Sequence, residues 1–455
     1  MIELLPDLLT VFARGGGGGS GGSSGGGGGE VIAMIGYFPS YYTGKLVKKL
    51  LPRKAELIVS FTSATLMSGL LLWLAYVIDG GFFFMFLIVL GIWLGWYAAF
   101  YGTWEKIKNR AARTKGAVDK AALSDSVWQS DQLLVHARQV FMQYQQNWSD
   151  FDITSMQSYM TRRQLLLSGL MLRSLREMGR VNTVANPFIA NIAIVNIHDA
   201  SDDSEDWFQV AIEASANDTL RDARSGQVLF TDKSTFIEYW TFVRQNNTWL
   251  LDRIDQATAD LSMRNQSIES FAREHNFYYM LDMGWLFLPN SGVLFSGGRF
   301  GKSDINNYTV GLVGQQLVQL YTYTPATNYN ILVGQINLPK SYEGILVRRK
   351  PRFLSTWTPP KPPREYQKHS LEWPDFNKRY EVSATNADRL AAFELLNPGF
   401  MAYLYDTDPG VSIEVADNIV YLYKYIGQQA DKLVGSKDYD TLMTILTKAH
   451  KELQL

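Results

Sequence analysis

The sequence predicts an α+β protein in which a two-span transmembrane hairpin precedes a domain of helices on a curved sheet and a second α+β domain. Three observations predict this fold class. Two uncharged apolar runs occupy residues 57–101, helical spacing of apolar residues dominates residues 103–178, and alternating apolar residues with turn signals follow. Helices followed by strands are typical of α+β domains, in which the helices cover one sheet face.

The two apolar runs give the strongest signal. No residue is charged over 57–78 or over 82–101, and Asp79-Gly80-Gly81 separates the two runs. Each run has about 20 residues, the length that a helix needs to cross about 30 Å of hydrocarbon. The alternative, a pair of buried core helices, requires amphipathic faces, and neither run has a polar stripe. We therefore expect two membrane spans.

Small residues recur at every fourth position in both runs. The residues of this predicted hairpin seam are Ser60, Ala64 and Ser68 in the first run and Gly91, Gly95 and Ala99 in the second. In an antiparallel hairpin these positions lie level, and small side chains there allow two backbones to approach closely. The alternative is chance, since Gly, Ala and Ser are common in membrane spans.

Basic residues flank both runs. They are Lys45, Lys48, Lys49, Arg53 and Lys54 before the first run and Lys106, Lys108, Arg110, Arg113 and Lys115 after the second. Basic residues beside spans are retained on the cytoplasmic side. The sequence thus predicts a multi-pass protein of the cell (inner) membrane with its main domains in the cytoplasm. The lipid bilayer is a predicted partner, including anionic lipid that meets these charges.

The first 56 residues divide into two parts. Residues 1–29 combine a Leu-rich segment that is signal-like or interfacial with a Gly/Ser-rich linker, and residues 30–56 form a short apolar and basic juxtamembrane segment. Residues 31–43 are apolar but too few for an ordinary span. Whether they cross the membrane and whether residues 1–14 are cleaved stay open.

Composition excludes several function classes. The 455 residues carry a formal net charge of -1, which gives no reason to expect nucleic acid as a partner. The chain has no cysteine, and this excludes disulfides, thiolate metal sites and cysteine nucleophiles. The five histidines have no paired metal or triad spacing. We expect no metal and no cofactor.

Residues 102–265 are predicted to form a linker helix and a domain, and a series of short motifs over roughly 119–259 carries a family resemblance. Ser124-Asp-Ser-Val-Trp128, Trp148-Ser-Asp-Phe-Asp152, Glu238-Tyr-Trp-Thr-Phe-Val-Arg244 and Trp249-Leu-Leu-Asp252, in that order, resemble the Tim-44-like domain family. The namesake of this family is the mitochondrial inner-membrane subunit that anchors the import motor, and bacterial relatives combine the domain with membrane spans. The resemblance implies a fold similar to nuclear transport factor two with a large apolar cavity.

The expected cavity supplies the candidate ligand-binding residues. Tyr239, Trp240, Phe242 and Glu238 lie on a predicted strand whose hairpin turns at Asn246-Asn247. Aromatic rings on that strand would line an apolar cavity. The alternative is an enzyme, in which buried carboxylates such as Glu238 act as general acid or base. We expect no catalytic residues.

The rest of the chain forms a second α+β domain over 266–427 and terminal helices over 428–455. This domain resembles a bacterial domain of unknown function through Tyr380-Glu-Val382, Leu395-Leu-Asn-Pro398 and Asn418-Ile-Val-Tyr-Leu422. The segment Ser296-Gly-Gly-Arg-Phe-Gly-Lys-Ser303 nearly matches a phosphate loop, but Ser296 replaces the first glycine and no helix follows. We interpret it as a tight turn.

These observations predict a membrane-anchored binding or scaffold protein. Its Tim-44-like cavity would hold a protein segment or a lipid at the inner membrane, in protein transport or membrane-protein assembly. The protein partner cannot be named from the sequence. The alternative is a small-molecule enzyme that uses carboxylates in the same cavity.

Overall fold

The computed structural model describes residues 35–43, 53–77, 82–101, 103–256, 264–283, 285–289, 291–295, 304–326, 329–351, 359–427 and 434–453. The predictions for residues 1–29 and for the phosphate-loop-like segment lie outside these ranges. Residues 35–43, in the predicted juxtamembrane segment, form a helix. The described chain falls into two compact units, one with residues 137–191 and 212–455 and the other with residues 35–136 and 192–211.

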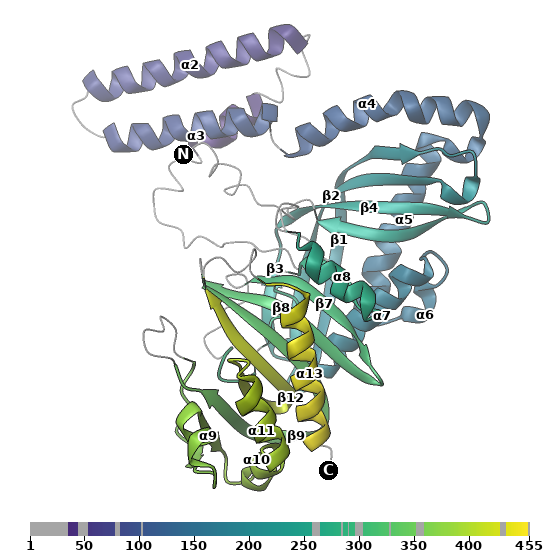
Figure 1. The fold of residues 1–455 in the computed structure, drawn as a ribbon. Coiled ribbons are helices and arrows are strands. Elements are labelled where there is room, and N and C mark those ends of the chain that lie inside the picture. Colours follow the sequence, from purple (N-terminus) through teal and green to yellow (C-terminus); the bar gives the residue numbers. More distant parts are fainter. Residues whose placement is uncertain are drawn as a thin grey trace. The chain divides into compact units, whose positions relative to one another are not determined.

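The secondary structure is helical first and mixed afterwards (Figure 1). The longer helices are α2 (Arg53–Val77), α3 (Phe82–Tyr101), α4 (Thr103–Ser124), α5 (Ser130–Ser149), α7 (Arg162–Glu177), α8 (Gln266–Glu274), α11 (Pro398–Thr407) and α13 (Ser436–Leu453). The short helices are η2 (Ser126–Trp128), α6 (Ile153–Met156), η3 (Asp203–Glu205), α9 (Pro374–Arg379) and α10 (Arg389–Leu395). The α+β class predicted from the sequence therefore describes the fold.

The strands form two sheets. The first contains β1 (Arg180–His198), β2 (Trp207–Asp222), β3 (Val228–Asp232), β4 (Thr235–Gln245) and β5 (Thr248–Gln256). The second contains β6 (Tyr278–Asp282), β7 (Asp304–Val313), β8 (Gln316–Ala326), β9 (Tyr329–Arg349), β10 (Gln367–His369), β11 (Tyr380–Ala384) and β12 (Ser412–Gly427).

Helices α2 and α3 form an antiparallel hairpin (Figure 1). Among the described residues, however, none of the helices combines the length and the apolar character that crossing a bilayer requires. The predicted two-span transmembrane hairpin is therefore wrong, and so is the multi-pass inner-membrane localisation derived from it. The prediction rested on the length of the two runs and on the absence of charge over 57–78 and 82–101, which is a weaker criterion than high hydropathy along the whole helix. As observed, α2 begins with Arg53, Lys54 and Glu56 and carries hydroxyl residues along its length.

The first sheet has the order β1-β2-β4-β5, with β3 paired to β2. Asn246 and Asn247 join β4 to β5, and both adopt positive φ, 49° and 58°. Asparagine tolerates this conformation, which two-residue hairpins need to match the twist of their strands. On the helical side, the indole of Trp148 in α5 donates a 2.7 Å hydrogen bond to the side chain of Asn182 in β1. This bond fixes the buried end of α5 on the sheet.

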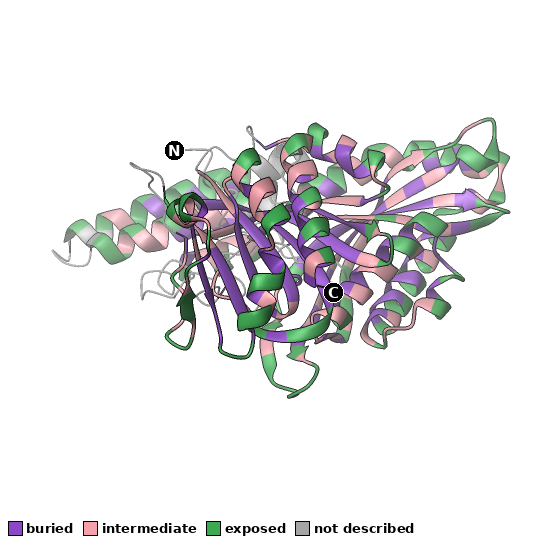
Figure 2. Cartoon of the chain, turned by 60° about the horizontal axis from the view of Figure 1, so that its bottom comes forward, coloured by how far each residue is buried: buried purple, intermediate pink, exposed green. Residues whose placement is uncertain are grey.

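The second sheet is built around β9. The first part of β9 pairs with β8 and its last part with β11, whereas β12 runs antiparallel along its other edge. The strands carry buried residues on both faces of the sheet, as the purple strands in Figure 2 show. A sheet that is covered on both sides needs a helix layer, and α13 provides part of it (Figure 1).

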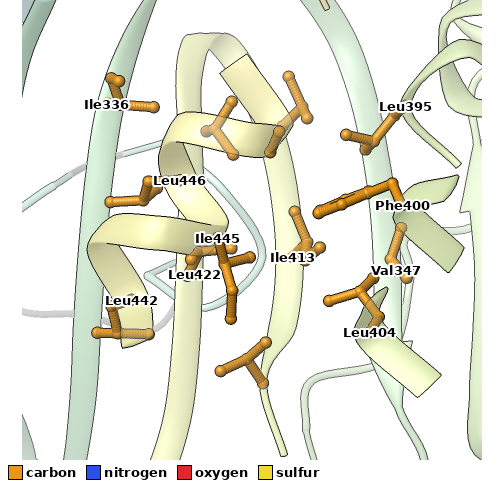
Figure 3. Packing of buried hydrophobic residues seen from close by; sticks show 14 of the residues in the cluster. Ile336, Val347, Leu395, Phe400, Leu404, Ile413, Leu422, Leu442, Ile445 and Leu446 are labelled. Carbon is orange, nitrogen blue, oxygen red and sulfur yellow. The ribbon is translucent and has the colours of Figure 1, made fainter. Parts of the chain in front are cut away.

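A large apolar core lies between the second sheet and its helices. Leu442, Ile445 and Leu446 recur at helical spacing on α13 and pack with Ile336 and Leu422 of the strands (Figure 3). Each of these side chains is at most 2% exposed. Burial of one such side chain is worth about 1.5–3 kcal/mol. The sheet face and α13 therefore stabilise each other.

Candidate binding sites

The predicted ligand-binding residues of β4 lie in the interior of the first domain. Glu238, Trp240 and Phe242 are fully buried, whereas Tyr239 points to the other sheet face and is half-buried. The ring centroid of Trp240 lies 5.3 Å from that of Phe141 and 5.4 Å from that of Tyr144, both on α5. The structure thus brings three of the four residues to one face. Their role in ligand binding stays a prediction.

Glu238 is part of a buried polar network. Its carboxylate accepts hydrogen bonds from the Trp240 indole at 2.8 Å and from the Gln256 side chain at 3.3 Å. Burial raises the pKa of Tyr144, and the nearby Glu238 carboxylate raises it further. Hydrogen bonds from neutral donors compensate a buried carboxylate in part. In this arrangement Glu238 holds the interior side chains in place.

The predicted seam residues lie in the hairpin of α2 and α3. Among the α2 residues whose side chains are described, the buried ones are Ser60, Ala64 and Ser68. On α3, Gly91 and Gly95 are buried, and the side chain of Ala99 lies outside the described set. A Cβ atom at Gly95 would overlap the Tyr37 carbonyl, and one at Gly36 would overlap that of Ile88. The closest neighbour of Gly95 is thus the helix over 35–43, which the seam prediction did not include.

An apolar pocket of about 500 Å³ lies between the helix over 35–43, α2 and α3. Its lining residues are Ile35, Gly36, Pro39, Ser40, Thr43, Val59, Ser60, Ser63, Ala64, Met67, Leu71, Ile88, Ile92 and Trp96. The hydroxyls of Ser40, Thr43 and Ser63 all donate to backbone carbonyls, and Ser60 Oγ accepts from the Trp96 indole. Because these polar groups are already bonded within the protein, the pocket suits an aliphatic ligand.

Many large apolar side chains on the same helices are exposed to solvent. We call them the hairpin surface: Ile35, Phe38 and Tyr42, then Val59, Phe61, Leu66, Met67, Leu70, Trp73 and Tyr76 on α2, and Phe83, Phe84, Phe86, Leu90 and Tyr97 on α3. Extended exposed apolar surfaces mark sites of interaction with partners or lipid. Helix α4 follows α3 directly and carries exposed Lys106, Lys108, Arg113 and Lys115.

A second pocket, of about 350 Å³, has a different character. We call it the arginine groove, because Arg163, Arg253, Arg264 and Arg273 line it together with Asp255 and Glu269. Gln256, the hydrogen-bond donor to Glu238, also lies in its wall. Sequence reasoning missed this groove, since its arginines belong to elements that are distant in the chain and form no motif.

Glu414 of β12 is a buried carboxylate that the sequence also did not reveal. Burial raises its pKa to about 7, while hydrogen bonds from the backbone N–H groups of Val293 and Leu294 oppose this shift. Its contacts attach the segment over 291–295 to the sheet.

Across the described ranges, no three His, Asp or Glu side chains are grouped so that they could hold an ion. The acidic loop between β1 and β2 has exposed side chains at Asp202, Asp203 and Glu205, and Asp202 caps η3 by accepting from the Ser204 backbone N–H at 2.9 Å. This loop therefore has a local structural role.

Comparisons with known proteins give only distant similarity. Neither a protein-family model nor a curated protein matches the chain. The crystal structure of the mycobacterial trehalose monomycolate transport factor A, TtfA, aligns with 42% of this chain and 93% of its own, at 14% identity and a TM-score of 0.31. The intermembrane space region of the chloroplast protein ARC6 aligns with 26% of this chain and 92% of its own, at 15% identity and a TM-score of 0.22. Scores this low carry no inference about function, and the Tim-44-like resemblance is not confirmed by a family match.

Proposed function

We propose that the chain is a binding or scaffold protein that associates with lipid through the hairpin surface. The observation that carries this proposal is the concentration of exposed apolar side chains on the helix over 35–43, α2 and α3. Leu66, Trp73 and Phe83, for example, are 69%, 59% and 66% exposed. Covering such side chains with apolar material is favourable by about 25 cal/mol per Å².

The positive charge of α4, next to the hairpin, favours lipid as the apolar material that covers the hairpin surface. Lys106, Lys108, Arg113 and Lys115 are exposed on α4, immediately after the apolar residues of α3. An apolar surface that continues into a basic one matches the acyl chains and anionic headgroups of a lipid surface. Association of the hairpin surface with lipid does not require a helix that crosses a bilayer.

The packed interior of the first domain favours a scaffold over an enzyme. The Glu238 carboxylate accepts hydrogen bonds from Trp240 and Gln256, and the aromatic rings around it are packed against α5. A general acid or base needs access to a substrate. We therefore propose that this domain serves as a scaffold. The Tim-44-like resemblance favours a protein partner, in protein transport or membrane-protein assembly.

Vesicle binding tests the proposal. The full chain should co-sediment with phosphatidylcholine vesicles, and more strongly when phosphatidylglycerol is included. Phe83→Gln, at a 66% exposed position of the hairpin surface, should weaken this binding by about tenfold, because burial of one aromatic side chain is lost. The matched control is Phe188→Gln on β1, which is 64% exposed and should bind like the wild type.

Variants of the basic residues on α4 test the electrostatic part of vesicle binding. Lys106→Gln combined with Lys108→Gln should clearly reduce the preference for anionic vesicles and leave binding to neutral ones. Lipid association through the hairpin surface would be contradicted if the chain sedimented equally with and without vesicles. It would also be contradicted if Phe83→Gln and Phe188→Gln weakened vesicle binding equally.

A further inference from the structure

The arginine groove joins four elements of the larger unit. Arg163 comes from α7, Arg253 from the end of β5, Arg264 from the residues before α8, and Arg273 from α8 itself. Tyr278 and Tyr279 of β6 complete one wall. The volume of about 350 Å³ lies in the range of small-molecule sites.

The groove has an excess of positive charge. Its lining contains four arginines but only two carboxylates, Asp255 and Glu269. Arg264 donates two hydrogen bonds, of 2.9 and 2.6 Å, to the Glu269 carboxylate. Arg253 forms an ion pair with Asp255 at 2.8 Å. These pairs hold two guanidinium groups in place. The charges of Arg163 and Arg273 also act on Asp255 and Glu269, respectively, and the four arginines outnumber the two carboxylates of the lining.

The remaining two arginines have weak contacts. Arg163 lies 3.7 Å from Asp252, outside the lining, and its guanidinium donates at 3.4 Å to the carbonyl of the same residue. Arg273 donates to the Ser270 hydroxyl at 3.2 Å. A guanidinium has five N–H donors, so these contacts leave most of its donors available to a ligand. The side chains of Arg163 and Arg253 are also about half exposed, at 56% and 51%.

Positive charges of the groove also act on Tyr278 in its wall. Burial raises the pKa of Tyr278, and the positive charges of Arg163 and Arg162 oppose this shift. Arg162 therefore adds to the positive field at the Tyr278 hydroxyl. The Tyr279 hydroxyl, by contrast, donates to Asn307 at 2.7 Å and is fixed within the domain.

We propose that the arginine groove binds a phosphate group carried by an organic molecule. Arginine forks match the oxygens of a phosphate, and several converging arginines favour a dianion over a monoanion. The groove is larger than a phosphate alone, and the tyrosine wall provides a surface for the organic part. The phosphate can come from a soluble phosphate ester or from a lipid headgroup.

Calorimetric titration of the full chain tests this inference. Inorganic phosphate and glycerol 3-phosphate should both bind, with glycerol 3-phosphate tighter, and the affinity should fall as sodium chloride increases. Arg163→Gln combined with Arg273→Gln should weaken both by at least about tenfold, since two charge-assisted contacts are lost. The matched control is Arg224→Gln, at a side chain that is 76% exposed and outside the groove, which should bind as the wild type does.

A conservative variant of Arg163 distinguishes the effect of the planar pair of N–H donors from the effect of the positive charge. Arg163→Lys keeps the charge but loses the planar donor pair, so its affinity should lie between those of the wild type and the Gln variant. Vesicles of phosphatidylcholine with and without phosphatidic acid distinguish the source: competition by phosphatidic acid against glycerol 3-phosphate identifies a lipid headgroup, and its absence identifies a soluble ester. Failure of both phosphate probes to bind, or equal losses in Arg224→Gln, would overturn the proposal. Either result leaves vesicle binding by the hairpin surface unaffected.

Discussion

Trp240 shows how one residue connects the packing of the first domain with its polar interior. Its ring packs against Phe141 and Tyr144, and its indole donates to Glu238. The alternation of residues on β4 predicted that Glu238 and Trp240 share a face. It did not distinguish a cavity wall from a packed core, because both place apolar residues on every second position. That distinction depends on α5, which lies elsewhere in the sequence.

Trp240→Ala should therefore destabilise the first domain. Loss of a fully buried Trp costs about 3–5 kcal/mol, and Glu238 would lose its indole donor. Tyr239→Ala, on the other sheet face, should cost clearly less. Urea unfolding followed by far-UV circular dichroism measures both midpoints. Similar midpoints for Trp240→Ala and the wild type would show that the ring lines an open space.

Glu414 should make stability depend on pH. In the unfolded chain its carboxyl ionises with a pKa near 4.5, whereas burial raises the folded pKa to about 7. Its stabilising contribution is complete below pH 4.5 and is lost as pH rises through 7, because only the unfolded state ionises in this window. The loss should approach roughly 3 kcal/mol.

The measurement is the unfolding free energy of wild type and Glu414→Gln between pH 4.5 and 8. The Gln side chain does not titrate, so the difference between the two proteins should grow with pH. The titratable groups facing Glu414 are Tyr366, Tyr421 and Tyr423, whose pKa values burial raises further out of this range. A difference that does not change with pH would show that the carboxyl is ionised throughout.

At the scale of elements, the sequence predicted the turns and hairpins that neighbouring residues determine. The Asn246-Asn247 turn and the pairing of β4 with β5 follow from residues that adopt positive φ between two alternating segments. The pairing of β12 with β9 depends instead on a side-by-side arrangement of strands that are far apart in sequence. No local pattern encodes it, and the arginine groove, built from distant elements, was missed for the same reason.

The helix over 35–43 gives a test at this scale. A methyl group at Gly95 would overlap the Tyr37 backbone, so Gly95→Ala should displace this helix from α3. Exposed Phe38 and Tyr42 would then be cut faster by chymotrypsin. Gly69→Ala on α2 is the control, because a Cβ there has no neighbour within 4 Å. Equal cleavage rates in both variants would mean that the helix does not depend on close contact at Gly95.

For the whole molecule, the order of apolar helices, further helices and then strands mixed with helices was predictable, because periodicity and turn residues reveal element type. Membrane crossing was not, since the length of the two runs and the absence of charge over 57–78 and 82–101 led to the wrong prediction of two spans. The exposed apolar side chains of α2 and α3 are what the structure adds. Their exposure favours lipid association of the hairpin surface.

A polarity-sensitive dye at one position of the hairpin surface tests this claim most directly. The chain has no cysteine, so a single introduced thiol can be labelled without competition. Leu66→Cys on α2 and Leu390→Cys on α10 form a matched pair, because the two leucines are 69% and 70% exposed. On addition of phosphatidylglycerol vesicles, the dye at Leu66 should shift to the blue and the dye at Leu390 should not. An unchanged spectrum at Leu66, or equal shifts at both positions, would contradict lipid association through the hairpin surface.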